Sequence, residues 1–300
     1  MDDRHSNDDR KFARDHGGEL FSALQRLLPQ HALSRLLGRV ADSRHPRLKR
    51  LLIEKAMARY GIDLEEAALP NAEDYPSFNH FFTRQLREGA RPIDDSAGAL
   101  LSPADGAVSQ LGEIRNGTLF QAKGHQFSTR QLLGLDDDLC RRFHCGSFAT
   151  VYLSPRDYHR VHMPCDGKLL ETLYIPGRLF SVNDTTTRHI PGLFARNERL
   201  VCLFETEYGL LALVLVGAIF VAGIRTAWRD YYKPDQCHHD KFAEPRLLGR
   251  GDEVGQFCFG STVVVATESP VTFADTLEPG SKVVMGGKMG EWRQATGARP

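Results

Sequence analysis

Three short segments of the sequence contain side chains whose types could support nucleophilic catalysis. The first is GQFCFGSTVVVATE, in which Ser261 follows Gly260 and precedes the β-branched residues 263–265. The β-branched run predicts a strand, and Ser261 would begin it. A serine hydroxyl becomes a nucleophile only when an adjacent base takes its proton. Because Gly and Ser are also common turn residues, this segment alone is weak evidence for catalysis.

The second segment, YLSPRDYHRVHMPCDG, contains two histidines three positions apart. His159 and His162 could each supply an imidazole base, and the same pattern also fits a polar turn or a structural histidine pair. A zinc site is a further alternative, with Cys237, His238 or His239 as additional ligands. These spacings match no usual zinc ligand set, so we expect no metal.

The third segment, SPADGAV, places Asp105 before Gly106 between apolar residues. By itself this is the pattern of an aspartate in a β-turn. The three segments are far apart in the sequence, so they could act together only if the fold places them side by side.

The first ninety-odd residues are expected to be helical. A first helix is predicted over residues 20–28, before Pro29. A second, basic amphipathic helix comes next, because apolar residues recur at positions i, i+3, i+4 and i+7, namely Leu33, Leu36, Leu37 and Val40. The apolar face of this helix must rest either on the protein itself or on a membrane surface. Both can hold if one face packs on the protein and the neighbouring residues contact lipid.

Two more helices are predicted in this region. One covers residues 47–59, is strongly basic and ends at Gly61. The other lies near residues 77–87 and presents an apolar stripe that we expect to be ordinary core, formed by Phe78, Phe81, Phe82 and Leu86.

From Leu100 onward the pattern changes to short strands separated by turn residues. The clearest hairpin combines residues 200–204 with residues 210–216. The predicted fold is therefore α+β, with a helical N-terminal region at 1–95 and a β-rich, mainly antiparallel domain at 96–300. The apolar stretch 210–224 is too short for a bilayer span and predicts buried strands.

The composition excludes some classes of partner and compartment. Lys plus Arg and Asp plus Glu are equal at 38 each, so no net field attracts nucleic acid, and any attraction to a membrane must come from a local patch. The six cysteines have no metal-finger spacing, and the N-terminus is too polar for a secretory signal. A reducing, cytosolic compartment fits this pattern best.

Taken together, the order SPADG, YHRVHMP and FGSTV resembles the phosphatidylserine decarboxylases, pyruvoyl enzymes that are made as proenzymes. The resemblance extends through FNHFFTRQLREGARPI, QAKGH, PGRLFSVN and GDEVGQFCFGSTVVV and covers most of the chain. One difference is Phe259, where the family usually has Leu. Both residues are apolar, so the difference concerns only local packing.

The resemblance implies that the chain cuts itself between Gly260 and Ser261. Ser261 would attack the Gly260 carbonyl, with His162 as general base and Asp105 orienting the imidazole, as in a serine-protease triad. His159 is expected to be a neighbour of the site, with a structural or a substrate-contacting role.

Self-cleavage would give a large chain of residues 1–260 and a small chain of residues 261–300. The first residue of the small chain, Ser261, would become a pyruvoyl group, which is the cofactor that the resemblance implies. That group would accept the electron pair released when phosphatidylserine loses CO₂ to become phosphatidylethanolamine. We expect His162 to act again, as the proton donor.

Because the substrate is a bilayer lipid, we expect peripheral association with the cytoplasmic face of the cell membrane. The basic helices between Arg35 and Arg59 are the candidates for this contact. The family also suggests a homodimer.

Two rival functions remain open at this point. A serine hydrolase could use Ser261, His162 and Asp105 on an external ester or amide, although the chain has no GxSxG motif around Ser261. A non-enzymatic β-domain with a helical membrane anchor would require all three segments to be simple turns, which their ordered coincidence disfavours.

Overall fold

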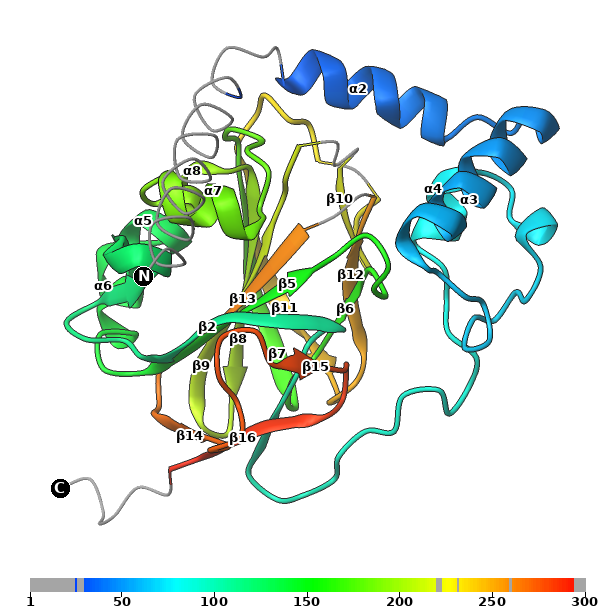
Figure 1. Cartoon of the computed structure of the whole chain (residues 1–300). Coiled ribbons are helices and arrows are strands. Elements are labelled where there is room, and N and C mark those ends of the chain that lie inside the picture. Colours follow the sequence, from blue (N-terminus) through cyan, green and yellow to red (C-terminus); the bar gives the residue numbers. More distant parts are fainter. Residues whose placement is uncertain (1–24, 26–29, 220–222, 231, 259–260, 294–300) are drawn as a thin grey trace, which may run out of the picture.

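A large antiparallel sheet forms the centre of the molecule (Figure 1). The computed structural model describes Gln25 and residues 30–219, 223–230, 232–258 and 261–293. In spatial order, the strands of this sheet are β11 (His238–Leu248), β7 (Gly167–Ile175), β8 (Arg199–Thr206), β9 (Gly209–Val216), β13 (Ser261–Thr267), β5 (Ser147–Leu153), β2 (Gly106–Glu113) and β15 (Lys282–Val283). The predicted α+β fold is confirmed.

Strand β13 lies inside the sheet and is hydrogen-bonded along both edges. Val263 is opposite Leu215 of β9 on one side and opposite Val151 of β5 on the other. The predicted hairpin is β8 followed by β9, which pair from Arg199 to Val216. Because side chains alternate along a strand, β13 contributes to the hydrophobic core on both faces of the sheet.

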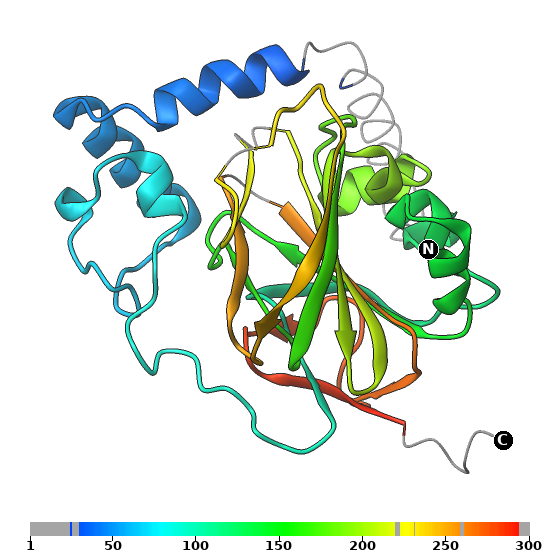
Figure 2. The same ribbon diagram turned by 180° about the vertical axis from the view of Figure 1, so that it is seen from behind.

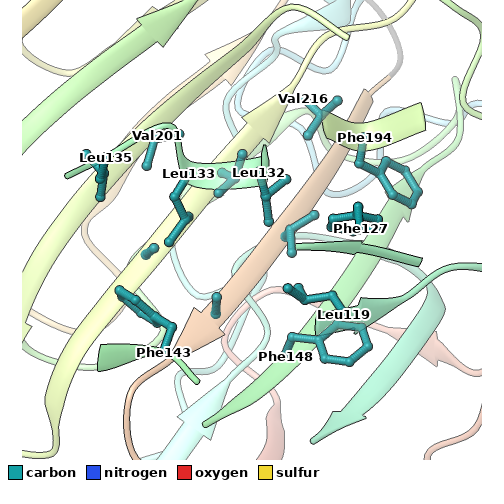
Figure 3. Packing of buried hydrophobic residues seen from close by; sticks show 14 of the residues in the cluster. Leu119, Phe127, Leu132, Leu133, Leu135, Phe143, Phe148, Phe194, Val201 and Val216 are labelled. Atoms are coloured by element: carbon teal, nitrogen blue, oxygen red, sulfur yellow. The ribbon is translucent and has the colours of Figure 1, made fainter. Parts of the chain in front are cut away.

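Helices cover one face of the sheet, and Figure 3 shows the side chains packed between them. Leu132, Leu133 and Phe194 from the helices contact a cluster that includes Val264 of β13. The helices on this face are α5 (Thr129–Leu133), α6 (Asp137–Arg142), α7 (Asp184–His189) and α8 (Leu193–Arg196). The hairpin of β3 (Thr118–Phe120) and β4 (Gln126–Ser128), with the short helix η2 (Ala122–Gly124), lies beside them.

Two small antiparallel sheets contribute to the core on the other face. One contains β10 (Ile224–Thr226), β12 (Glu253–Phe257) and β6 (Arg160–His162), and the other contains β1 (Ala99–Leu101), β16 (Lys288–Trp292) and β14 (Val271–Phe273). Val263, Val161 and Phe257 share this core cluster. The histidine segment and the start of β13 are therefore on the same side of the large sheet.

The N-terminal helical region has a small core of its own, built around Ile53, Phe78, Phe81 and Phe82. Its elements are α2 (Gln30–Ala41), α3 (Pro46–Tyr60), the short helix η1 (Ala72–Asp74) and α4 (Phe78–Phe82). In both views, α3 and α4 lie on the opposite side of the sheet from α5 to α8 (Figures 1 and 2). As predicted, α3 ends at Gly61, which has the left-handed φ of 64°.

The predicted helix over residues 77–87 is wrong in its second half, because α4 ends at Phe82. The Thr83 hydroxyl donates to the Asn79 carbonyl at 2.8 Å, within the last turn of the helix. Leu86 then pairs as an isolated bridge with Ala67, and the Ala68 amide donates to the Gln85 carbonyl. After Thr83 the backbone therefore forms hydrogen bonds with residues 66–68 instead of continuing the helix.

Helix α2 forms where it is predicted, but it buries a different face. Its buried residues are Gln30, Ser34, Gly38 and Ala41, whereas Leu36 is 58% exposed. The predicted helix over residues 20–28 falls outside the described residues except for Gln25. In the part of the chain that the structure describes, no helix combines the length and apolarity needed to cross a bilayer.

Candidate active site

Ser261 is the first residue of β13, held between Leu153 of β5 and the end of β9. It is fully buried, and its Oγ has no hydrogen-bond partner among the described residues. Since residues two apart on a strand face the same way, Ser261 points to the same side as Val263, toward the histidine segment. A buried hydroxyl without a partner is costly in free energy and requires an explanation, for which a role in chemistry is one.

His162 is the last residue of β6, and backbone bonds connect it to the other predicted segments. Its amide donates to the carbonyl of Pro103 at 2.8 Å, two residues before Asp105. Its Cα partner on β12 is Glu253. The fold thus brings the YHRVH and SPADG segments side by side.

Both ring nitrogens of His162 are occupied. Nδ1 lies 2.8 Å from the Gly251 carbonyl, which can only accept, so Nδ1 carries the proton. Nε2 lies 3.0 Å from the Tyr158 hydroxyl, which therefore donates to it. Burial lowers the pKa of His162, and the bond to Gly251 opposes that shift. The ring is therefore neutral at pH 7, with its basic nitrogen covered by Tyr158.

Asp105 is held by an arginine and a backbone amide. Arg91 donates to it from Nε at 3.0 and 3.2 Å and from Nη2 at 2.6 Å, and the Met285 amide donates at 2.8 Å. Arg91 also pairs with Glu66 at 2.8 Å. These carboxylates raise the pKa of Arg91, chiefly through the hydrogen bond to Asp105.

The segments of Asp105 and His162 are thus adjacent, and Ser261 lies on the same side of the large sheet, but the three side chains form none of the hydrogen bonds of a triad among the described residues. Within the described residues, the side chain of Asp105 bonds to Arg91 and Met285, that of His162 bonds to Gly251 and Tyr158, and that of Ser261 bonds to nothing. Gly260, the other side of the predicted scission, lies outside the described residues.

His159, unlike His162, has a basic nitrogen that no described group covers. Its Nδ1 donates to the Asp157 carbonyl at 2.8 Å, and its Nε2 is buried with no partner in the described chain. Its ring centroid lies 4.0 Å from that of Phe82 of α4. Its carbonyl accepts from the Phe257 amide at 3.0 Å, next to the segment that leads to Ser261. Burial lowers the pKa of His159 to about 3, so this imidazole is neutral with an available lone pair.

Zinc was the alternative use of these histidines. Among the residues that the structure describes, no group of three or more His, Cys, Asp or Glu side chains is placed to hold a metal ion. His159 instead packs on Phe82, and His239 pairs with Glu171 at 2.8 Å.

Sequence reasoning missed two residues that shape the site, Tyr158 and Arg91. Tyr158 directly precedes His159 in the motif, and Arg91 lies in the GARPI segment. Nothing in their spacing predicts that one contacts His162 and the other Asp105. Those contacts depend on the tertiary fold, in which β6 lies beside the turn that contains Asp105.

Comparisons with known proteins identify the family of this chain. A family model described as phosphatidylserine decarboxylase matches residues 78–291, and a second, described as PSD, matches residues 20–61. Proteins named phosphatidylserine decarboxylase proenzyme from Acinetobacter baylyi and Alcanivorax borkumensis are each 52% identical to this chain. The alignments cover 91% of this chain and 95% and 96% of those relatives. A Bordetella petrii protein of the same name is 52% identical over 82% of this chain and 88% of its own length. The chain that places Ser261 at the buried start of a central strand therefore belongs to the phosphatidylserine decarboxylase family.

Proposed function

We propose that this chain is a proenzyme that cuts itself between Gly260 and Ser261 and then decarboxylates phosphatidylserine through a pyruvoyl group at position 261. The observation that carries the proposal is the buried, unpartnered hydroxyl of Ser261 at the start of β13. A nucleophilic role explains why this buried hydroxyl has no structural hydrogen bond among the described residues. The family membership supplies the reaction class.

The cleavage chemistry needs no external reagent except water. Ser261 Oγ attacks the carbonyl carbon of Gly260, and the peptide bond becomes an ester. Removal of the Cα proton of residue 261 then expels the Gly260 carboxylate and leaves dehydroalanine. Tautomerisation and addition of water release ammonia and leave a pyruvoyl group on the small chain. The products are residues 1–260 and 261–300.

A base must take the hydroxyl proton, and this role can be assigned to His162. Asp105 would stabilise the resulting imidazolium from its position beside the His162 backbone, in the manner of a serine-protease triad. For this step, Nε2 of His162 must exchange its bond to Tyr158 for one to Ser261. His159 is the second candidate, because its buried Nε2 lone pair has no partner among the described residues.

The surroundings of residue 261 suit a buried, electron-withdrawing carbonyl group. When formed, the pyruvoyl group supplies an electron sink for the pair left behind by departing CO₂. His159 and His162 lie on the same side of the sheet, and burial lowers the pKa of both imidazoles, which are therefore neutral at pH 7. His162 is the proposed donor of the proton that replaces CO₂.

The proposed site of membrane contact is the exposed surface of α2 and α3. Leu36 is 58% and Leu51 is 48% exposed, and Arg35, Arg39 and Lys55 lie among the apolar side chains of these helices. Each basic residue near an anionic bilayer contributes about 1 kcal/mol. We therefore propose peripheral binding at the cytoplasmic face of the cell membrane, with the homodimer expected from the family.

Intact-mass measurement of the purified chain tests this proposal. The expected result is two fragments that correspond to residues 1–260 and 261–300, the smaller one with a carbonyl in place of its amino terminus. A Ser261→Ala variant should remain one chain and release no CO₂ from phosphatidylserine. A single unbroken wild-type chain that hydrolyses esters would instead support a serine hydrolase.

A further inference from the structure

Three arginines line one cavity next to the proposed scission segment. Arg84, Arg160 and Arg225 contribute to a cavity of about 350 Å³ whose described lining contains no Asp or Glu. Cys258 also lines it. Cys258 is three residues before Ser261, so their Cα atoms can be no more than about 11 Å apart. The cavity is therefore close to the reacting position.

Arg84 is a buried cation that forms no ion pair with a described carboxylate, although Asp63, Asp105 and Asp157 act on it at longer range. Its exposure is 7%, its Nη2 donates to the Arg156 carbonyl at 3.0 Å, and its Nη1 has no partner in the part of the chain that the structure describes. Its guanidinium carbon lies 5.7 Å from the centre of the Phe81 ring. Burying a guanidinium is costly unless a negative group pairs with it, and a ligand can supply that group.

The other two arginines differ in how far they are already paired. Arg160 donates to Glu253 at 2.6 Å and to the Thr83 carbonyl at 2.9 Å. Arg225 is half-buried in β10, and its side chain forms no hydrogen bond or ion pair with the described residues. Arg84 and Arg225 are therefore the two cations available to a bound anion.

We propose that this cavity binds the phosphodiester of the phospholipid substrate, with Arg84 and Arg225 as its ligands; this inference rests on the proposed function. In phosphatidylserine the phosphorus is only three bonds from the carbon that carries the amine. When the substrate amine is bound to the pyruvoyl group at residue 261, the substrate phosphate must therefore lie within a few ångström of that residue.

The phosphate suits these cations better than the substrate carboxylate does. A cation paired with the carboxylate would stabilise the reactant, whose charge disappears as CO₂ leaves, and would slow the reaction. The phosphate keeps its charge throughout, so binding it favours reactant and transition state equally. Loss of such a contact raises KM and leaves kcat unchanged.

An adjacent apolar cavity supports a lipid rather than a small anion. A second cavity, of about 650 Å³, is lined by Leu37, Val40, Leu52 and Phe78 and shares Asn79 and Cys258 with the cationic one. A cationic cavity beside an apolar one matches a phosphate attached to acyl chains. The polar cavity beside Asp105 is less suited to an anion, because Asp63, Glu66 and Asp157 also line it.

The test compares Arg225→Gln and Arg225→Lys in self-processed enzyme acting on dioctanoylphosphatidylserine in nonionic detergent. A charge-assisted contact of this kind predicts a roughly 10- to 100-fold rise in KM for Arg225→Gln, with kcat within about twofold of wild type. Arg225→Lys should recover part of the loss. Arg229→Gln is the matched control, because Arg229 pairs with Asp240 and does not line the cavity, and its KM should equal that of wild type.

The phosphate site would be contradicted if Arg225→Gln left KM unchanged, whether or not kcat fell. The proposed function would still hold in that case, provided that the wild-type enzyme decarboxylates phosphatidylserine. A wild-type chain that neither splits nor releases CO₂ would instead refute the proposed function.

Competition separates the substrate's phosphate from free phosphate. Glycerophosphoserine should inhibit the wild type competitively and inhibit Arg225→Gln at least tenfold more weakly. Inorganic phosphate that inhibited as strongly as glycerophosphoserine would indicate a free-anion site and contradict the assignment. If Arg84→Gln folds, it should also raise KM and leave kcat unchanged. If it does not fold, the Arg225 variants alone test whether the cavity binds the phosphate.

Discussion

The Tyr158 hydroxyl lies 3.0 Å from His162 Nε2, while the other ring nitrogen of that histidine is held by the Gly251 carbonyl at 2.8 Å. The pair fixes the tautomer of His162 and covers its basic nitrogen. Tyr158 is itself buried, and burial raises its pKa, so the hydroxyl keeps its proton at neutral pH. Self-cleavage by His162 must therefore begin with the loss of this bond.

Replacing Tyr158 with Phe tests that requirement. The variant removes the competing donor, so we expect processing at least as fast as wild type, with a loss of about 1–2 kcal/mol in the free energy of unfolding from the unpaired nitrogen. Processing is followed by gel electrophoresis of newly synthesised chain, and stability by urea titration. A slowing of tenfold or more would show that the hydroxyl carries the proton between Ser261 and His162.

Alanine substitution of each histidine assigns the base. His162→Ala is expected to slow processing by about 10²- to 10⁴-fold, the usual contribution of a general base. His159→Ala should have a smaller effect on processing if His159 is only a neighbour of the site. The reverse order of rates, measured by intact mass over time, would move the base role to His159 and its unpartnered Nε2.

Arg91 should stabilise the fold through Asp105. Arg91→Gln leaves a buried carboxylate without its cation, so we expect a loss of about 3–5 kcal/mol in the free energy of unfolding. Arg50→Gln is the control, because Arg50 and Glu54 are 60% and 54% exposed and such pairs contribute less than about 1 kcal/mol. Equal effects in urea titration would mean that the Asp105 pair contributes no more than a surface pair.

Acid should destabilise the chain through His159. Its folded pKa of about 3 is below the unfolded value near 6.5, so the unfolded chain binds more protons between these values and stability falls as the pH falls. The expected loss is about 1.4 kcal/mol per pH unit below 6.5, or about 2 kcal/mol between pH 7 and pH 5. Urea titration of the uncut Ser261→Ala chain measures it. His159→Gln in that background should flatten the profile, and an unaltered slope would locate the acid sensitivity elsewhere.

Vesicle flotation tests the membrane surface. Replacing Leu36, Leu37 and Val40 with Ser should abolish binding to anionic vesicles, because these side chains lie on the exposed or half-exposed face of α2. Leu247→Ser is the matched control, since Leu247 is 77% exposed and lies on the edge strand β11, opposite Lys168 of β7, rather than on α2 or α3. Undiminished flotation of the triple variant would leave α2 with a purely internal role.

Local patterns predicted the elements, and long-range contacts decided the details. The β-branched run after Ser261 predicts β13, and Gly61 ends α3 as expected because glycine accepts its positive φ. The helix end at Phe82 could not be predicted, since residues 85–87 bond to residues 66–68, a pairing with no periodic signal. Ser261 and His162 could be predicted as site residues from their sequence motifs. The contacts of Tyr158 with His162 and of Arg91 with Asp105 could not, because they form only in the folded chain.

The central position of β13 would keep the two products of self-cleavage together. Residues 261–293 supply β13, β14, β15 and β16, and β13 is hydrogen-bonded to strands from the larger fragment along both edges. A scission at its first residue would therefore leave a nicked but undivided β-sheet, from which the shorter polypeptide could leave only if the core were dismantled. The new terminus would stay anchored where it was made, so each molecule would keep the one reactive group that it generates and could not exchange it with another.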